Sequence, residues 1–411
     1  MNIIKWTSLT LGLIVLWGGL LIVGTLNGWF RTPIAPEDDP DAFMKSAVAY
    51  LQKSEPANIA FVLIEEGKIH DTYFSEGINK DTLFPVSSMS KWFTAHGVMS
   101  LVESGKIGLD APVSDYLTRW QLPDSEFNND LVTPRLLLSH MAGLSDGLGF
   151  GDYTADEQLP SLEESLVNPR ASSGLHVIIG VDQQPGTEWD YSGGSYLILE
   201  LLIEEVSGQT FRSYIQQTIF DPLEMSRSTY DYIGHQENTA QSLTIDGQSV
   251  PFYQYAAASA TGLTTTARDL TAFLEAQDLE STNSAPLSFR RLKQMQAPEA
   301  SLLGSPIWGL GTILYAENEA GDFIYGHSGQ NEPAINSEAR INPSNGDGII
   351  VLVNGAPSLA TRLGNLWTIW QTGRPDFLSL GAEFHRVVPW FGIGMLVIFL
   401  AAVFGFWRSK R

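Results

Sequence analysis

Ser88 and Lys91 are the residues whose types and spacing most directly suggest chemistry. They form the only Ser-x-x-Lys in the chain, where a loop containing Pro85 runs into an apolar stretch typical of a helix. Residues three apart share one face of a helix, so the lysine amine can approach the serine hydroxyl. A serine hydroxyl needs a neighbouring base, and a lysine can serve where burial or nearby cations lower its pKa. The pair therefore indicates acyl transfer through a serine nucleophile.

Composition excludes several other kinds of function. The chain has 411 residues, enough for a large core, and a net charge of −22 that disfavours nucleic-acid binding. It contains no cysteine, which rules out disulfides, thiolate metal sites and cysteine nucleophiles. Its seven histidines show no metal-ligand spacing. We therefore expect neither a metal nor another cofactor.

Both ends of the chain carry an uncharged apolar stretch. Residues 9–26 and 387–407 are each close to the ~20 residues that span a bilayer. The second stretch is followed by Arg408, Lys410 and Arg411, and such basic clusters stay in the cytoplasm. We expect two transmembrane helices with both termini cytoplasmic and the intervening chain extracytoplasmic. A cleaved signal peptide is the alternative for the first stretch.

The intervening chain shows strand patterns near its two ends and helical patterns between them. This order predicts an α+β fold in which an antiparallel sheet, built from both ends, is flanked by helices and carries a mainly helical insertion at about 110–297. We expect an anchor and linker at 1–36, one domain at 37–380 and a second anchor with its tail at 381–411. The predicted strands are residues 58–64, 67–74, 309–315, 323–326, 334–341 and 348–353, and the predicted helices are 42–51, 88–103, 195–206 and 267–276.

Several further segments occur in an order that resembles one family. After Ser88 come Thr133-Pro134-Arg135-Leu136-Leu137-Leu138-Ser139-His140, then Tyr191-Ser192-Gly193, Phe220-Asp221-Pro222-Leu223-Glu224-Met225 and Gly326-His327-Ser328-Gly329-Gln330-Asn331. Over about residues 45–370 the chain resembles the serine beta-lactamase and penicillin-binding-protein superfamily, nearest its class C-like branch. That resemblance implies the beta-lactamase/transpeptidase-like fold.

The resemblance also assigns a role to each site residue. Ser88 matches the nucleophile that forms an acyl-enzyme, Lys91 its base, and Tyr191 the tyrosine that relays protons to the leaving group and to water. The oxyanion donors would be the backbone N–H groups of Ser88 and Gln330. The implied substrate-binding residues are Gly193, His327, Ser328 and Gly329. Ser139 and His140 are interpreted as structural.

Two substitutions depart from the family pattern. His327 stands where beta-lactamases usually carry a lysine that attracts the substrate carboxylate, and a histidine is a weak cation at neutral pH. Gly193 stands where the family usually has an asparagine that contacts the lysine and a substrate amide. Both changes argue against a dedicated beta-lactamase and leave the substrate open.

The function that follows is a membrane-anchored serine hydrolase. Its substrate would be a small molecule or a peptide, either an amide, such as a D-amino-acid cell-wall peptide, or a carboxylic ester. The alternative is a catalytically weak penicillin-binding or sensing module, which would acylate Ser88 without useful turnover. Gly193 and the two anchors motivate this second hypothesis.

Overall fold

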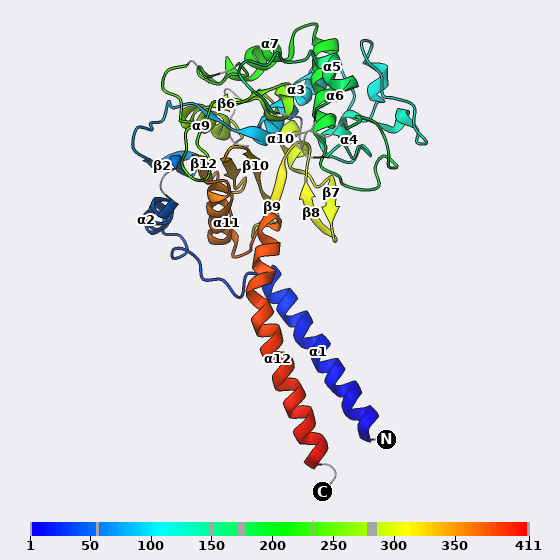
Figure 1. Cartoon of the computed structure of the whole chain (residues 1–411), viewed down its shortest axis with the longest axis vertical. Helices are drawn as coiled ribbons and strands as arrows, with labels where there is room; N and C mark the ends of the chain where they lie inside the picture. Colours follow the sequence, from blue (N-terminus) through cyan, green and yellow to red (C-terminus); the bar gives the residue numbers. More distant parts are fainter. Residues whose placement is uncertain are drawn as a thin grey trace.

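An eight-stranded antiparallel sheet organises the head of the molecule (Figure 1). The computed structural model describes residues 2–54, 57–147, 152–170, 177–231, 233–234, 236–277 and 286–408. The strand order is β2-β1-β12-β11-β10-β9-β8-β7, so strands from the two ends of the domain pair in its centre, as predicted. The strands are β1 (Asn58–Glu65), β2 (Lys68–Phe74), β7 (Ala300–Leu302), β8 (Ser305–Trp308), β9 (Ile313–Glu317), β10 (Phe323–Asn331), β11 (Ile335–Ile341) and β12 (Gly348–Asn354).

Alternate residues of the central strands supply two separate hydrophobic clusters. On β1, Phe61 and Leu63 face the cluster that contains Trp367, whereas Ala60 and Val62 face the larger cluster of the helical part. Successive side chains of a strand point to opposite faces of a sheet, so a strand apolar at every position is covered on both sides. Helices α2 (Pro40–Leu51) and α11 (Leu359–Thr372) cover the first face. The sheet is thus the middle layer of the head.

The helical part covers the other face and holds the element with the Ser-x-x-Lys pair. α3 (Ser90–Glu103) is buried along almost its whole length, which explains why its sequence is apolar on all sides. The other helices here are α4 (Pro134–Leu138), α5 (Leu162–Val167), α6 (Gly193–Ser207), α7 (Phe211–Ile215), α8 (Ala258–Thr261), α9 (Ala267–Glu275) and α10 (Phe289–Gln296). Two-residue strands β3 (Phe84–Pro85), β4 (Asp152–Tyr153), β5 (Gln254–Tyr255) and β6 (Thr264–Thr265) form two small pairs.

Most predicted elements are present, and the differences have local causes. The predicted strand 309–315 is wrong at its start, because Gly309 to Thr312 form a turn in which the Gly309 amide donates to the Thr312 carbonyl at 2.9 Å. Gly311, with φ of +72°, takes the left-handed conformation that this turn needs. β10 continues five residues beyond the predicted end at Gly326, so the whole Gly326–Asn331 motif is strand. The patterns did not predict β7, β8, α10 or α11.

Two long apolar helices leave the head together (Figure 1). α1 (Asn2–Leu26) and α12 (Leu380–Arg408) pack against each other, and the Trp17 indole donates to the Trp390 carbonyl at 3.2 Å. The stretches Ile4–Leu26 and His385–Arg408 are long and apolar enough to cross a membrane, although a signal sequence also meets this test. In the second stretch only 6% of the residues of its most apolar window are buried, so α12 is not a core helix. Lys410 and Arg411 of the predicted basic tail lie outside the described residues.

Candidate active site

Ser88 lies in a short 3₁₀ turn, η2 (Ser87–Met89), that leads directly into α3. The preceding residue, Ser87, has φ of +50°, a conformation that a non-glycine side chain rarely adopts. Hydrogen bonds hold it there, since its hydroxyl donates to the Gln330 carbonyl at 3.0 Å and its carbonyl accepts from the Ser90 hydroxyl at 2.6 Å. Strained residues of this kind collect at functional sites where the surroundings fix them. The turn leaves Ser88 partly exposed, between buried neighbours.

Lys91 is completely buried one turn below Ser88. Its Nζ lies 3.5 Å from the Ser88 Oγ and donates to the Ala260 carbonyl of α8 at 3.0 Å. The first distance is at the outer limit of a hydrogen bond, and catalytic contacts of this kind often tighten only when substrate binds. No carboxylate forms a salt bridge with Lys91 in the described part of the chain. The amine is therefore oriented by a carbonyl and free of an anionic partner.

The loop before α6 places Tyr191 beside the lysine. Lys91 Nζ lies 4.8 Å from the centroid of the Tyr191 ring, within range of a cation–π contact. The Tyr191 ring also stacks on the His140 ring, with centroids 4.3 Å apart. Burial and the nearby Lys91 charge hold the pKa of His140 well below its usual value, so this imidazole is neutral. Its Nδ1 accepts a hydrogen bond from the Ser192 amide at 3.1 Å, which positions the loop that carries Tyr191.

Strand β10 runs against the turn that carries Ser88. A Cβ on Gly329 would lie only 1.9 Å from the Val86 carbonyl oxygen, so only glycine permits this approach. The Ser337 hydroxyl of β11 donates to the same Val86 carbonyl at 2.8 Å and holds the two segments together. This contact brings Gln330 next to Ser87 and Ser88. The two predicted oxyanion donors thus belong to segments that touch.

His327 is buried on β10, with 1% of its surface exposed. Its Nδ1 lies 2.7 Å from the Ser328 carbonyl and so carries the proton, whereas its buried Nε2 has no hydrogen-bond partner among the described residues. Burial lowers the pKa of His327 to about 3. The hydrogen bond to the Ser328 carbonyl opposes this shift in part, and the nearby Lys91 charge adds a smaller lowering. The imidazole is therefore neutral at physiological pH and cannot attract a substrate carboxylate as a cation.

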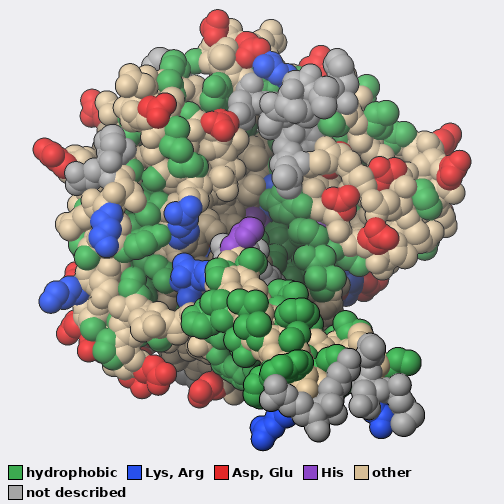
Figure 2. Space-filling model, turned by 60° about the horizontal axis from the view of Figure 1, so that its bottom comes forward, with side chains coloured by type: hydrophobic (Ala, Val, Ile, Leu, Met, Phe, Trp, Pro, Cys, Tyr) green, Lys and Arg blue, Asp and Glu red, His purple; other side chains and the backbone are tan. Residues whose placement is uncertain are grey.

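A cleft of about 670 Å³ opens above these residues. Ser88, Tyr191, His327, Ser328 and Gln330 of the predicted site line it. The rest of its wall is largely apolar or acidic and consists of Trp189, Ile245, Trp308, Ile313, Asn331, Glu332, Pro333, Pro357, Phe377 and Leu378. Figure 2 shows a hollow in this face of the head with a histidine side chain in it, and hydrophobic side chains gather to its right and below it.

Lys91, Gly193 and Gly329 do not line the cleft. Lys91 lies beneath Ser88, and Gly329 serves the contact between β10 and the η2 turn that carries Ser88. Gly193 is the buried first residue of α6, and its amide donates to the Gly147 carbonyl at 3.4 Å. Among the described residues no side-chain amide contacts Lys91 in place of the asparagine that Gly193 replaces.

The sequence reasoning missed the aromatic surroundings of the site. His140, which the motif analysis interpreted as structural, packs between Tyr191 and Trp308, with its ring centroid 4.9 Å from that of Trp308. Phe377 and Leu378 reach the cleft from the short turn η6 (Phe377–Ser379) before α12. The Ser139-His140 segment was visible as a motif, but no spacing in the sequence relates Trp308 or Phe377 to Ser88.

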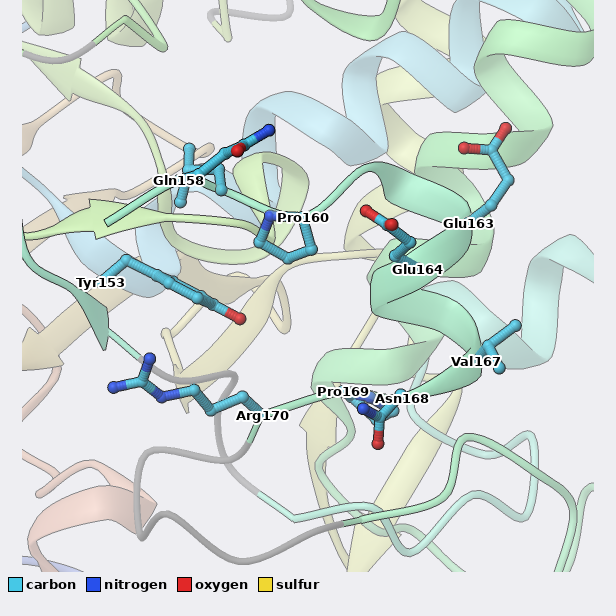
Figure 3. Close-up of a pocket in the computed structure, with 10 residues that line it drawn as sticks. Tyr153, Gln158, Pro160, Glu163, Glu164, Val167, Asn168, Pro169 and Arg170 are labelled. Carbon is cyan, nitrogen blue, oxygen red and sulfur yellow. The ribbon is translucent and has the colours of Figure 1, made fainter. Parts of the chain in front are cut away.

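A second hollow lies elsewhere on the helical part (Figure 3). It has a volume of about 920 Å³, and Tyr153, Glu163, Glu164 and Arg170 contribute to its wall. The Arg170 guanidinium lies over the Tyr153 ring at 4.7 Å and pairs with Glu157 at 2.7 Å. None of the described residues that line it belongs to the predicted site, so the Ser88 cleft remains the candidate active site.

Comparison with known proteins identifies the family of this chain. The profile of the Beta-lactamase family matches residues 41–374, and the chain belongs to this family. A penicillin-binding protein of Bacillus subtilis (strain 168) is 31% identical over 151 residues, which cover 37% of this chain and 31% of that protein. The chain thus aligns with about a third of the length of the first curated relatives.

Solved structures show the same fold. The octameric penicillin-binding protein homologue from Pyrococcus abyssi superposes with a TM-score of 0.64 at 23% identity, over 80% of this chain and 77% of that one. The beta-lactamase/D-alanine carboxypeptidase from Pseudomonas syringae has a TM-score of 0.63 at 18% identity, over 79% and 97% of the two chains. The fold is therefore beta-lactamase/transpeptidase-like, as the motifs indicated.

Proposed function

We propose that this protein is a membrane-anchored serine hydrolase that acts on neutral esters or amides through an acyl-enzyme. The observation that carries the proposal is the convergence of Ser88, Lys91 and Tyr191 at one cleft. The Lys91 amine lies 3.5 Å from the Ser88 hydroxyl and 4.8 Å from the centre of the Tyr191 ring. Membership of the Beta-lactamase family supports the same chemistry.

The arrangement suits a two-step reaction. Ser88 Oγ attacks the substrate carbonyl carbon while Lys91 accepts its proton, directly or with Tyr191. The backbone N–H groups of Ser88 and Gln330 stabilise the resulting oxyanion. The bond to the leaving group breaks, and the leaving group takes up the proton. Water then attacks the acyl-serine ester, a carboxylic acid is released, and Ser88 regains its proton.

The electrostatics of the cleft favour a substrate without a free carboxylate. Among the described residues that line the cleft there is no lysine or arginine, and Glu332 adds a negative charge. His327 is neutral because its pKa lies at about 3. A carboxylate would therefore meet no cation at the surface of the cleft, whereas a neutral acyl group meets tryptophan and isoleucine. This supports esters and neutral amides over penicillins and peptides that end in a free D-amino acid.

The distribution of aromatic residues supports membrane anchoring by α1 and α12. Trp29 and Phe30 follow α1 and are 60% and 42% exposed, and Trp390 near the start of the second apolar stretch is 55% exposed. At the opposite end of the pair, Trp407 is 58% exposed. Tryptophan collects at both edges of a bilayer, so these residues fit its two interfaces. With the termini in the cytoplasm, the head would lie outside it.

Labelling with a fluorophosphonate probe tests the nucleophile. Full-length protein in detergent should form an adduct on Ser88, located by mass spectrometry of the peptides, and the Ser88→Ala protein should form none. Folded protein that gives no adduct would contradict the proposal. Rates with p-nitrophenyl esters, D-amino-acid anilides and nitrocefin then rank the substrate classes, and we expect the esters to be fastest.

Turnover separates the hydrolase from a sensing module. Gly193 removes a side-chain contact that the family usually makes with substrate, and a weakened site could acylate and then stall. A single burst of p-nitrophenol equal to the protein concentration, with no further release, would favour the sensor. Continued release at a steady rate would favour the hydrolase.

A further inference from the structure

We infer that the acyl group comes from the membrane: the substrate is an amphiphile of the adjacent leaflet, with a neutral ester or amide near its headgroup and its chain in the apolar part of the Ser88 cleft. This inference rests on the proposed hydrolase function and on the proposed anchoring. It names the class of substrate, which neither the fold nor the family defines.

The first observation is that one wall of the cleft leads directly into an anchor. Phe377 and Leu378 of η6 line the cleft, and α12 begins at Leu380. The membrane-length stretch begins at His385, seven residues after Leu378, which is on the order of 10 Å along a helix. A headgroup layer is roughly 5–8 Å thick. Leu378 therefore lies close to the outer edge of that layer.

The second anchor reaches the same place. Gly28, just after α1, approaches the turn at the end of α11 so closely that a Cβ on it would lie 2.1 Å from the Gly373 carbonyl oxygen. Gly373 is four residues before Phe377. Both apolar helices thus join the head at the base of the cleft wall, which fixes the orientation of the cleft relative to the membrane.

The β7–β8 hairpin provides a second apolar edge on this side. Its tip carries Leu302 and Leu303, which are 50% and 100% exposed, and Figure 1 shows the hairpin extending from the head toward the side of α1 and α12. Trp308 at the end of β8 and Ile313 at the start of β9 line the cleft. The cleft is thus bounded by two apolar segments, η6 and this hairpin, that both extend toward the proposed membrane surface.

A buried ion network holds the η6 wall against the catalytic sheet. Asp376, directly before Phe377, pairs through Oδ2 with Arg340 of β11 at 2.5 Å, and its Oδ1 accepts from the Ser379 amide at 2.8 Å. Arg340 also pairs with Glu338 at 3.0 Å, and all three side chains are inaccessible to solvent. Removing one partner from a buried ion network is strongly destabilising, so the wall has a fixed position. A fixed apolar wall suits an acyl chain better than a wide range of peptide side chains.

Alkyl fluorophosphonates of two chain lengths test the inference. Full-length protein in phosphatidylcholine vesicles is treated with ethyl and dodecyl probes, and the rate of labelling at Ser88 is measured for each. We expect the dodecyl probe to react at least about tenfold faster. Leu378→Ser should lower the ratio of the two rates about fivefold, the effect of losing one partly buried leucine contact.

Two further variants make the result specific. Ile245, which lines the cleft and is 67% exposed, can be changed without risk to the fold, and Ile245→Ser should also lower the ratio. Val167→Ser replaces an apolar residue that is 72% exposed in the wall of the other hollow, and it should leave both rates unchanged. All proteins share the same vesicles, so partition of the probes into lipid affects them equally.

The outcomes distinguish this inference from the function on which it rests. Absence of labelling by either probe would overturn the proposed hydrolase itself. Labelling at equal rates by both probes, or a ratio that stays the same in both Leu378→Ser and Ile245→Ser, would overturn the membrane-derived substrate and leave the hydrolase in place.

Discussion

Replacing Gly329 by alanine tests the contact that joins the nucleophile turn to the predicted oxyanion strand. The new Cβ would lie 1.9 Å from the Val86 carbonyl oxygen and 2.7 Å from the Ser337 hydroxyl. Ordinary contacts begin at about 3.4 Å, so β10 and the turn must separate by about 1.5 Å. That movement displaces the Gln330 amide relative to Ser88 Oγ.

The expected cost to catalysis follows from this displacement. A misplacement of about 1 Å can cost about 100-fold in rate, and loss of one oxyanion donor costs about 100- to 1,000-fold. We therefore expect kcat/KM for a p-nitrophenyl ester to fall at least about 100-fold in Gly329→Ala. Crowding of this kind also lowers the free energy of unfolding, by about 1–3 kcal/mol.

A matched control separates the effect of Gly329→Ala on catalysis from its effect on stability. Gly108→Ala places its Cβ 3.5 Å from the nearest atom, in the Ala111 side chain, so it should change neither the activity nor the unfolding midpoint. Thermal unfolding of Gly329→Ala, followed by tryptophan fluorescence, shows whether the measured protein is folded. Folded Gly329→Ala with kcat/KM within threefold of the native value would refute the reasoning.

Three other predictions concern buried ionisable residues. Lys91→Met should slow fluorophosphonate labelling of Ser88 by about 100-fold or more, because it removes the amine that accepts the serine proton. It should not lower the unfolding temperature, because methionine is an apolar side chain of similar length for a completely buried position. Unchanged labelling would exclude Lys91 as the base. Folding lowers the pKa of His327 to about 3, so the unfolded chain binds this proton at a higher pH than the folded protein does. The free energy of unfolding should therefore decrease as pH falls from about 6.5 toward 3. Urea titrations at several pH values should show a shallower decrease in the free energy of unfolding for His327→Gln. Parallel curves of this free energy against pH in the two proteins would contradict the lowered pKa of His327. Burial raises the pKa of Glu200 to about 7, so its contribution to the pH dependence of stability has the opposite sign. This contribution is fully present below about pH 4.5 and is lost as pH rises through 7. Glu200→Gln should therefore gain stability relative to the native protein between pH 5 and 8, and a constant difference would show that Glu200 does not titrate there.

Local sequence patterns were sufficient to predict those strands and helices whose buried residues recur at a regular interval. The apolar runs of β1 and β12 and the spacing in α6 predicted these elements to within a few residues, because the burial of each element is repeated in its own residues. The strand predicted over 309–315 was wrong at its start, because residues 309–312 form the turn between β8 and β9 and apolar character alone does not reveal that turn.

The candidate site was predictable only where its residues belong to ordered motifs. Ser88 and Lys91 are linked by helical spacing, and Tyr191, His327 and Gln330 by resemblance to a family. The contact of His140 with Tyr191, the support of Lys91 by the Ala260 carbonyl and the cleft wall formed by Phe377 had no comparable signal. Each depends on segments that meet only after the chain has packed.

The sequence by itself determined which reactive groups this protein has, several of the strands and helices of the head, and the two apolar stretches at its ends. Those properties follow from short-range periodicity and from the chemistry of single side chains. Only the tertiary structure decided that His327 is buried and neutral, and that the cleft wall leads into the apolar helix α12. Burial and proximity depend on which distant segments pack together, and that is a property of the whole fold.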